Sequence, residues 1–540
     1  MRAIPCHAIQ AKPSGQDNGK YWMGSTAAGG VPLSIRRRAA SRRVACLALF
    51  ALAHSAPVPA APSWFSGTGL SQPAIDLLAA MNRAHEWGLE PGDYHAANIL
   101  AQARTADTPE RRAQAEAALS ASALRFISHL HYGRVDPKKV GFDMPERTSA
   151  FDAGALLEKL ATTRDTRGLL ASAEPAFQHY LLLKAQLARY RELALQRGLA
   201  ELPKPGGRSI AAGEDYAGAP ALRTLLVELG DLSRAQRAPD SDLSLDPQLI
   251  EALRRFQFRH GLQQDGVLGP QSYQALTTPM ATRVRQIELT LERWRWLPAR
   301  KAPTIIVNIP QFRLFAFPSE SDREAQMLAM DVIVGQTYPG SRTPVFAEDM
   351  KFVVFHPYWD VPRSIMSREM LPRIRRSPGY LATRDLEIVE PGGAITQHPT
   401  EEQIQALASG KSRLRQRPGP GNALGLVKFM LPNRYNVYLH STPANELFKA
   451  SRRAFSHGCI RVSDPVALAE YVLRQAPGDW SREKIEAAMH GGKTLQVNLR
   501  QPVQVLILYG TAVANEAGQV YFFEDIYGND ARLAKVLGIQ

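Results

Sequence analysis

The sequence predicts a multidomain protein in which an all-α region and a small helical module precede a mainly β domain. Three observations support this prediction. The chain has 540 residues, too many for one hydrophobic core, and at roughly 100–200 residues per domain it should form about three. Apolar residues recur at helical spacing from about Ser71 to Arg197. Short strand patterns separated by Gly, Pro and Asn begin at about Thr304.

The first 60 residues have the pattern of an export signal. A basic segment, Arg36–Arg43, precedes the apolar run Val44–Ala53, whose length is typical of a signal-peptide core. Val58–Ala60 is a small-residue sequence of the kind that signal peptidases cleave. We therefore expect a leader over residues 1–60. The alternative is a retained membrane anchor, for which the run is short compared with the ~20 residues that span a bilayer.

The formal net charge of the chain is +14. Part of this charge belongs to the expected leader, and the remainder favours an anionic partner such as a cell-wall polymer or a membrane surface. We find no helix-turn-helix, zinc-finger or RNA-binding signature, so nucleic acid is not an expected partner. A dispersed surface charge without a partner is the alternative.

We expect an all-α domain over residues 66–202, because no alternating strand pattern interrupts its helical periodicity. Its clearest helical stripe consists of Tyr180, Leu183, Leu187, Tyr190 and Leu193. The Pro- and Gly-rich segment Pro203–Gly207 has the composition of a linker. The domain shows no cluster of catalytic residue types.

The next region, residues 216–280, has the pattern of a small helical module. Asp246 is a helix-capping residue, and Pro247 suits the first helical turn. Gly261 should end this helix, and Asp265–Pro270 should form a tight turn into a second one that ends near residue 276. The apolar residues on one face of the first helix are Leu249, Ile250, Leu253 and Phe256.

Residues 303–500 should form the mainly β domain. The expected strands are Thr304–Ile309, Arg313–Phe317, Met330–Gly335, Phe352–Phe355, Val427–Met430 and Asn436–His440. One helix should begin at Pro465 with Asp464 as its cap. Its apolar face would comprise Val466, Ala469 and Val472.

Two further segments belong to this part of the chain. Residues 372–425 are long for a loop and rich in Pro, Gly, Arg and Gln. Loops of such length are usually functional or disordered, so we expect a lid-like insertion over a nearby site. Residues 501–540 should form a C-terminal extension that packs on the β domain or on the all-α domain.

Cys459 is the only cysteine after residue 46. A single thiol cannot form an internal disulfide, and with histidines nearby it is a candidate nucleophile. His440 should lie at the end of a strand, a rigid position that suits a catalytic base. Its imidazole would take the thiol proton and hold the thiolate as an ion pair. The alternatives are a buried structural thiol, or a zinc site of His440, His457 and Cys459, whose spacing matches no common zinc pattern.

The neighbours of Cys459 suggest supporting roles. Gly458 lets the backbone approach a substrate closely, and the Gly458 and Cys459 N–H groups would stabilise a tetrahedral oxyanion. Arg461 should share a face with Cys459, where it would hold a substrate carboxylate or brace the loop. His457 should shape the loop through hydrogen bonds, with a second base as the alternative. In strict alternation Asn436, Tyr438 and His440 share one face of their strand, opposite Val437 and Leu439.

These motifs resemble a known family. His440–Pro443 followed by Ser456–Arg461 resembles the catalytic signature of L,D-transpeptidases with the YkuD-type fold. Other segments similar to the family are Val334–Gln336, Arg342–Phe346, Pro357–Pro362, Gly419–Gly425, Tyr509–Ala512 and Asp525–Gly528. Phe256–Leu262 with Asp265–Gly269 resembles a small peptidoglycan-binding domain. The whole arrangement resembles the large periplasmic branch of the family, with its helical scaffold domain.

The resemblance implies a β-sandwich catalytic domain and cysteine-dependent acyl transfer. Cys459 would attack the third residue of a peptidoglycan stem tetrapeptide, with His440 as the base. D-Alanine would leave, and a diamino-acid amine of a second stem would take the acyl group in a 3→3 cross-link. Ser441, His457, Gly458 and Arg461 would support this chemistry, and Trp359, Tyr438 and Ser456 would contact the substrate. The family needs no cofactor or metal, and carbapenems acylate the same cysteine.

The resemblance also implies the setting of the protein and its alternatives. It suggests a periplasmic protein of peptidoglycan biosynthesis and cell shape, with stem peptides, glycan and other cell-wall enzymes as partners. Water as acceptor would make the protein an L,D-carboxypeptidase, and a lipoprotein acceptor would make it an attachment enzyme. The remaining alternatives are a papain-like wall endopeptidase and a non-catalytic peptidoglycan-binding protein.

Overall fold

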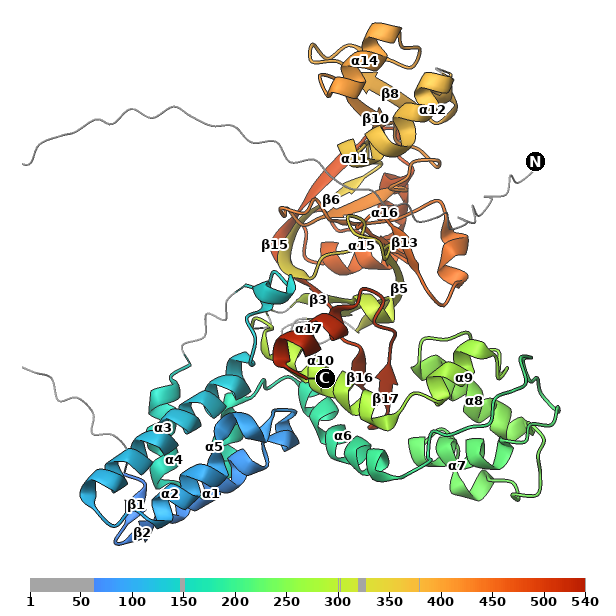
Figure 1. The fold of residues 1–540 in the computed structure, drawn as a ribbon. Coiled ribbons are helices and arrows are strands. Elements are labelled where there is room, and N and C mark those ends of the chain that lie inside the picture. Colours follow the sequence, from blue (N-terminus) through green and yellow to red (C-terminus); the bar gives the residue numbers. More distant parts are fainter. Residues whose placement is uncertain are drawn as a thin grey trace, which may run out of the picture. The chain divides into compact units, whose positions relative to one another are not determined.

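The structure, a computed structural model, describes residues 63–145, 151–299, 301, 303–318, 327–377 and 379–539. The expected leader over residues 1–60 lies outside this part of the chain. Within the described residues, no helix is both long enough and apolar enough to cross a membrane. The expected order of an all-α region, a helical module and a mainly β domain is confirmed (Figure 1).

The N-terminal region is helical, after a short hairpin of β1 (Phe65–Ser66) and β2 (Gly69–Leu70). Its helices share one core around the fully buried rings of Trp64 and Phe126. The α-helices are α1 (Gln72–Asn82), α2 (Ala96–Arg104), α3 (Pro109–Tyr132), α4 (Ala153–Thr162) and α5 (Thr166–Ala173). The 3₁₀ turns are η1 (Ala84–Trp87), η2 (Pro91–Tyr94) and η3 (Pro137–Val140).

The helical stripe expected around Tyr180 lies on α6 (Gln178–Leu195), and its apolar residues are all buried. They pack in a second core, separate from that of α1–α5. This second core also contains residues of α7 (Ala219–Leu229), α8 (Pro247–Arg259), α9 (Pro270–Leu276) and α10 (Met280–Arg295). The hairpin of β16 (Ala512–Ala514) and β17 (Val520–Phe522) completes it. Helix α6 thus packs with the helical module, although the sequence places it in the preceding domain.

Helix α8 begins as predicted. The Asp246 side chain accepts a hydrogen bond from the Leu249 N–H, and Pro247 occupies the first turn. The other Asp246 oxygen forms an ion pair with Arg223 at 2.8 Å, and the Arg223 side chain is fully buried. Asp246 therefore both caps the helix and neutralises a buried charge.

The β domain is built on a nine-stranded sheet, in the order β13-β5-β14-β12-β11-β6-β15-β3-β4. An additional pairing of β4 with β5 closes the sheet on itself around the largest apolar core. The first strands are β3 (Thr304–Asn308), β4 (Arg313–Phe317), β5 (Leu328–Gly335) and β6 (Phe346–Phe355). The others are β11 (Val427–Met430), β12 (Leu439–His440), β13 (Ala454–Ser456), β14 (Ile460–Val462) and β15 (Leu495–Leu508). The 3₁₀ turns η5 (Ile309–Gln311) and η7 (Asn445–Lys449) lie between strands.

Two expectations for this domain change in detail. The strand expected over Asn436–His440 is limited to β12, because Asn436 has a left-handed φ of 52° and leaves the extended conformation. The boundary expected at residue 501 falls inside β15, which pairs with β6 on both sides of a register shift between Asn498 and Val503. The C-terminal residues therefore supply an interior strand of the sheet before they form the β16–β17 hairpin.

Helix α15 (Pro465–Leu473) is capped by Asp464, as predicted. Ala469 and Val472 are buried, but Val466 is only half-buried, and Leu468 and Leu473 take its place in the core. Helices α16 (Arg482–Met489) and α17 (Asn529–Leu537) follow later in the chain.

Residues 372–425, expected as a lid-like insertion, are part of a folded insertion with regular secondary structure instead of a long irregular loop. The insertion has its own sheet, in the order β7-β10-β8-β9, and its own apolar core (Figure 1). Its strands are β7 (Trp359–Asp360), β8 (Leu386–Val389), β9 (Ile395–Thr396) and β10 (Arg413–Gln416). Its helical elements are α11 (Arg363–Ile365), η6 (Met366–Met370), α12 (Leu371–Arg376), α13 (Tyr380–Thr383) and α14 (Glu401–Ser409).

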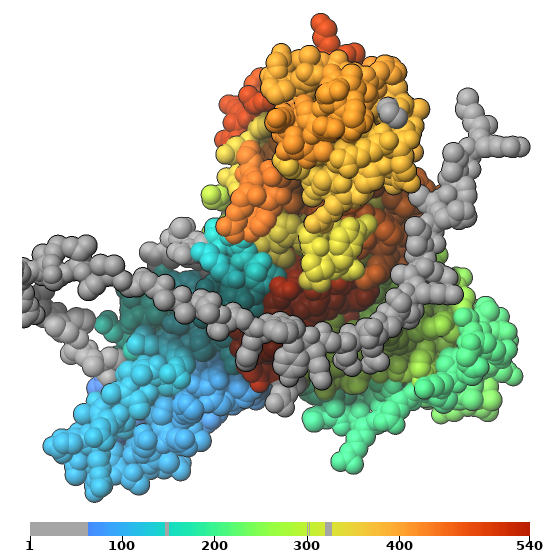
Figure 2. All heavy atoms as spheres, turned by 45° about the horizontal axis from the view of Figure 1, so that its top comes forward, coloured from blue at the N-terminus to red at the C-terminus, as the bar shows by residue number. Residues whose placement is uncertain are grey.

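The insertion begins before residue 372, at β7, and its elements are too short to show a clear periodicity in the sequence. In Figure 2 its yellow and orange residues gather on one part of the molecular surface. One local signal was present, a capping box in which Thr400 and Gln403 bond reciprocally at the start of α14.

The two Asp–Pro helix starts allow a matched stability test. Asp246→Ala should destabilise α8 by about 3 kcal/mol, because it removes the cap and leaves the buried Arg223 charge without its nearest carboxylate. Asp464→Ala removes only a cap from α15 and should cost about 1 kcal/mol. Native-state hydrogen exchange of amides in each helix measures both opening free energies. Equal costs would contradict the role given to the buried ion pair.

Candidate active site

Sheet register brings the two sequence motifs together. Strand β12 pairs with β14 in parallel, with Leu439 opposite Ile460 and His440 opposite Arg461. Strand β11 pairs with β12 from the other side and places Lys428 opposite His440. Side chains of paired residues project from the same face of a sheet. His440, Arg461 and Lys428 therefore share one face, while Leu439 and Ile460 point into the apolar core.

Tyr438 and Cys459 extend this polar face by one step. The Ile460 N–H donates to the Tyr438 carbonyl at 3.1 Å, which continues the ladder beyond β12. The Tyr438 hydroxyl lies close enough to the Cys459 thiol to lower the pKa of that thiol. The rings of Tyr438 and His440 lie 5.8 Å apart between centroids. The structure thus brings Cys459, His440, Tyr438 and Arg461 into one group.

His440 is buried, with 4% of its surface exposed. Its Nδ1 lies 2.6 Å from the Ser441 carbonyl. A carbonyl can only accept, so Nδ1 carries the hydrogen and Nε2 keeps its lone pair. Burial, with the nearby charge of Arg461, lowers the pKa of His440 to about 3. The imidazole is therefore uncharged at neutral pH.

Cys459 is a free, half-buried thiol. Its Sγ donates to the Asn436 carbonyl at 3.7 Å. Burial raises the pKa of the thiol, against the opposite effects of Tyr438 and Arg461. Within the described residues, no hydrogen bond joins Cys459 to His440. A neutral thiol beside a neutral imidazole thus replaces the ion pair expected from the sequence.

Ser456 shapes the turn that carries the thiol. Its Oγ accepts a hydrogen bond from the Gly458 N–H at 3.1 Å and donates to the Cys459 carbonyl. Gly458 has a φ of 118°, a conformation that favours glycine. The Gly458 N–H is therefore engaged, whereas the Cys459 N–H has no hydrogen-bond partner in the described part of the chain. Ser456 is itself buried, with 3% of its surface exposed.

The other expected supporting residues connect the site to its surroundings. Ser441 Oγ accepts from the Leu426 N–H at 2.7 Å and fixes the chain segment that leaves the insertion. His457 Nε2 lies 2.6 Å from Glu369 Oε1, on η6 of the insertion. Trp359, on β7, lies close enough to Tyr438 to lower the pKa of its hydroxyl. The insertion therefore contacts both the loop of Cys459 and the polar face of the sheet.

The sequence showed no role for two residues that hold the Cys459 loop. Thr343 Oγ1 accepts from the Gly335 N–H and donates to the Gly458 carbonyl, both at 2.8 Å. The Tyr527 hydroxyl donates to the Gly335 carbonyl at 2.6 Å and accepts from the Thr343 N–H at 3.2 Å. Both residues occur in segments that resemble the family, and that resemblance was the one available signal.

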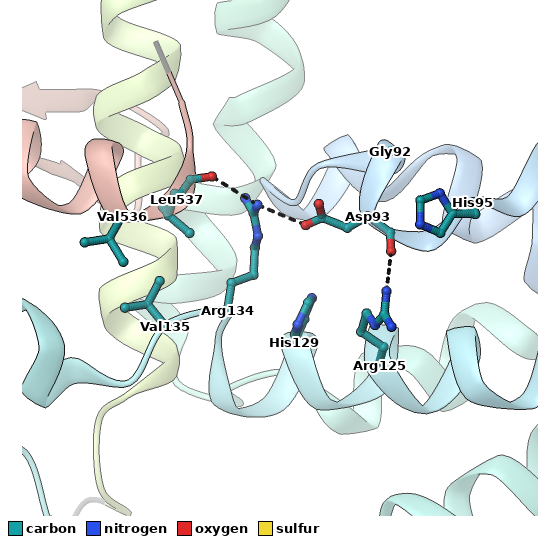
Figure 3. Close-up of a pocket in the computed structure, with 9 residues that line it drawn as sticks. All are labelled: Gly92, Asp93, His95, Arg125, His129, Arg134, Val135, Val536 and Leu537. Atoms are coloured by element: carbon teal, nitrogen blue, oxygen red, sulfur yellow. Dashed lines mark hydrogen bonds and ion pairs between the residues drawn. The ribbon is translucent and has the colours of Figure 1, made fainter.

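A cavity of about 360 Å³ lies elsewhere in the described structure (Figure 3). None of the expected site residues lines it. Its walls come from η2, α3 and α17, where Arg134 bonds to Asp93 and to the Leu537 carbonyl. Among the described residues, no group of three or more His, Cys, Asp or Glu side chains is placed to hold a metal ion.

Three regions of the chain match known domain families. Residues 302–504 match an L,D-transpeptidase catalytic domain of the YkuD family. Residues 59–187 match a scaffold domain, and residues 218–276 match a peptidoglycan-binding domain. The chain therefore contains a region similar to the YkuD-type L,D-transpeptidase catalytic domain, preceded by regions similar to scaffold and peptidoglycan-binding domains. These domains indicate an extracytoplasmic location.

Two individual proteins are similar to parts of this chain. A putative L,D-transpeptidase of Haemophilus influenzae is 30% identical over 230 residues, which are 42% of this chain and 45% of the relative. The match thus spans less than half of the relative's length. The crystal structure of an L,D-transpeptidase from Xylanimonas cellulosilytica is 14% identical, with a TM-score of 0.17. That alignment covers 57% of this chain and 100% of the other.

The burial of Cys459 predicts an alkaline pH profile for its alkylation. Because its pKa is raised, the thiol stays protonated through neutral pH. The thiolate fraction, and with it the alkylation rate, should still be increasing at pH values above ~8.5, the ordinary pKa of a thiol. Iodoacetamide labelling of the native protein, followed by mass spectrometry of the Cys459 peptide, measures this rate. The same protein unfolded in urea is the control. A native rate that levels off below pH 7 would show an ion pair and contradict the neutral resting state.

Thr343→Val should lower turnover about tenfold with little loss of fold, because two hydrogen bonds that hold the Cys459 loop disappear while the side-chain shape remains. Thr304→Val is the matched control, since Thr304 is also buried and hydrogen-bonded but lies on β3. The measurement is kcat for each variant. Equal effects of the two substitutions would remove the positioning role of Thr343.

Proposed function

We propose that the protein is a cysteine-dependent L,D-transpeptidase that forms 3→3 cross-links in peptidoglycan. The observation that carries this proposal is the parallel register of β12 and β14, which sets Tyr438 beside Cys459 and His440 beside Arg461 on one polar face. The match of residues 302–504 to the L,D-transpeptidase catalytic domain supports it.

The first half of the reaction would form a thioester. The Cys459 proton passes to Nε2 of His440 as Sγ attacks the carbonyl carbon of the third stem residue. The tetrahedral intermediate collapses with cleavage of the bond to D-alanine, whose amine takes the proton from the imidazolium. Because thiol and imidazole both start neutral, charge develops only during the attack, in a site where burial strengthens electrostatic interactions.

Neighbouring groups would stabilise that developing charge. The free Cys459 N–H is a candidate oxyanion donor. Burial and the contact with Cys459 raise the pKa of Tyr438, so its hydroxyl stays protonated and can donate to the forming thiolate. The Nε of Arg461 has no hydrogen-bond partner within the described structure. Arg461 is therefore a candidate to bind a carboxylate of the substrate.

The second half of the reaction would transfer the acyl group. The side-chain amine of a diamino acid in a second stem attacks the thioester, gives its proton to His440 and releases Cys459 as a thiol. Trp359 would contact one of the stems, because it joins the insertion to Tyr438 beside the thiol. The chemistry uses protein groups alone and takes place outside the cytoplasm.

Substitution of the two central residues tests these roles. Cys459→Ala should abolish turnover while the fold remains, because the nucleophile is lost. His440→Ala should lower kcat by more than about 10³-fold, since the imidazole that would take the proton is lost. The assay is mass spectrometry of products from disaccharide-tetrapeptide. Wild-type protein should release D-alanine and give a dimer joined 3→3.

Other products would point to other activities. Tripeptide without dimer would indicate water as the acceptor, and turnover retained in either variant would remove its assigned role. Ser364→Ala is a suitable control, because Ser364 is exposed on α11 of the insertion and outside the polar face.

A further inference from the structure

Two aromatic side chains lie together at the surface of the peptidoglycan-binding domain. Phe258, on α8, is 53% exposed although it is a large apolar residue. It stacks edge-to-face on Tyr521 of β17, with ring centroids 5.8 Å apart. The two residues are far apart in the sequence and come from different domains of the chain. Tyr521 is half-buried. Single exposed apolar residues are common, but an exposed aromatic ring packed on a second, partly accessible one often marks a binding surface.

The outward orientation of both rings follows from the packing of their elements. On α8, Phe256 is 1% exposed and fills the core, so Phe258 two residues later points away from it. On β17, Val520 and Phe522 are buried in the same core, and alternation turns Tyr521 outward. The pair is therefore built into the fold and does not depend on a mobile loop.

Buried contacts fix the hairpin against α8. Arg259 forms an ion pair with Asp231 and donates to the Val520 carbonyl, with both charged side chains buried. The His260 ring stacks on Phe522 at 5.9 Å. These contacts fix the residues on both sides of Tyr521 against α8, and they therefore fix the position of Tyr521 relative to Phe258.

Polar groups surround the two rings. Arg254 and Arg255 lie one helical turn before Phe258 on α8, and both are exposed. The Asn515 side chain donates to the Tyr521 hydroxyl at 3.4 Å. An aromatic ring face bordered by hydrogen-bond donors suits a sugar ring, which offers C–H groups on its face and hydroxyl or carbonyl oxygens at its edge.

We propose that Phe258 and Tyr521 form a composite binding site for the glycan strand of peptidoglycan. Phe258 lies inside the matched peptidoglycan-binding domain, residues 218–276, which favours a wall polymer as the occupant. Tyr521 lies outside that domain, so the C-terminal hairpin completes the site. The proposal is independent of the chemistry at Cys459. Binding here would hold the enzyme on the polymer whose stem peptides it acts upon.

Sedimentation with purified peptidoglycan tests this site. The full chain carrying Cys459→Ala serves as the parent, so that the polymer is not altered during the assay. Adding Phe258→Ala or Tyr521→Ala should weaken binding about tenfold, the size expected for loss of one well-placed aromatic contact. Phe258→Tyr should retain binding, because it keeps the ring. Ile395→Ala is the matched control, since Ile395 is also 53% exposed but lies on the insertion.

Competition identifies the part of the polymer that is bound. Glycan chains stripped of stem peptides should displace the parent protein, whereas free stem peptide should not. The proposal is overturned if the parent does not sediment, if both alanine variants bind as tightly as the parent, or if only the stem peptide competes. Absence of turnover by the native chain would overturn the proposed function instead, because the binding assay does not depend on it.

Discussion

The parallel pairing of two short strands, β12 and β14, is the constraint on which the candidate site depends. Each strand is only two or three residues long, yet each lies inside the closed nine-stranded sheet. The one-step alternation of side chains then separates the roles of neighbouring residues. Leu439 and Ile460 anchor the pair in the core, and His440 and Arg461 face the opposite side. A slip of one residue would turn these polar side chains toward the apolar core.

Burial decides the electrostatic state of the site. The same enclosure that positions His440 and Cys459 disfavours their charged forms, which lowers the pKa of the imidazole and raises that of the thiol. A site of this kind starts neutral and separates charge only when a substrate is attacked. The fixed donors around it, including the hydroxyl of Tyr438, can then stabilise charge without rearrangement.

Segments from distant parts of the chain support this small group. Thr343 and Tyr527 hold the loop of Cys459 through the backbone of Gly335. Glu369 reaches the same loop from the insertion through His457. The C-terminal residues supply β15 and then the β16–β17 hairpin, so one stretch of chain contributes to both the catalytic sheet and the core of the peptidoglycan-binding domain. The catalytic and peptidoglycan-binding domains therefore share structural elements and are not joined by a linker alone.

The sequence by itself determined the order of the domains, the Asp–Pro starts of α8 and α15, several strands and the residues Cys459 and His440, because caps, periodicity and short motifs are local. Tertiary structure alone decided the rest. The folded insertion depends on contacts among short elements, and the engagement of the Gly458 N–H depends on the turn that Ser456 closes. The neutral state of Cys459 and His440 depends on burial. Each of these is set by neighbours that the linear order of the chain does not reveal.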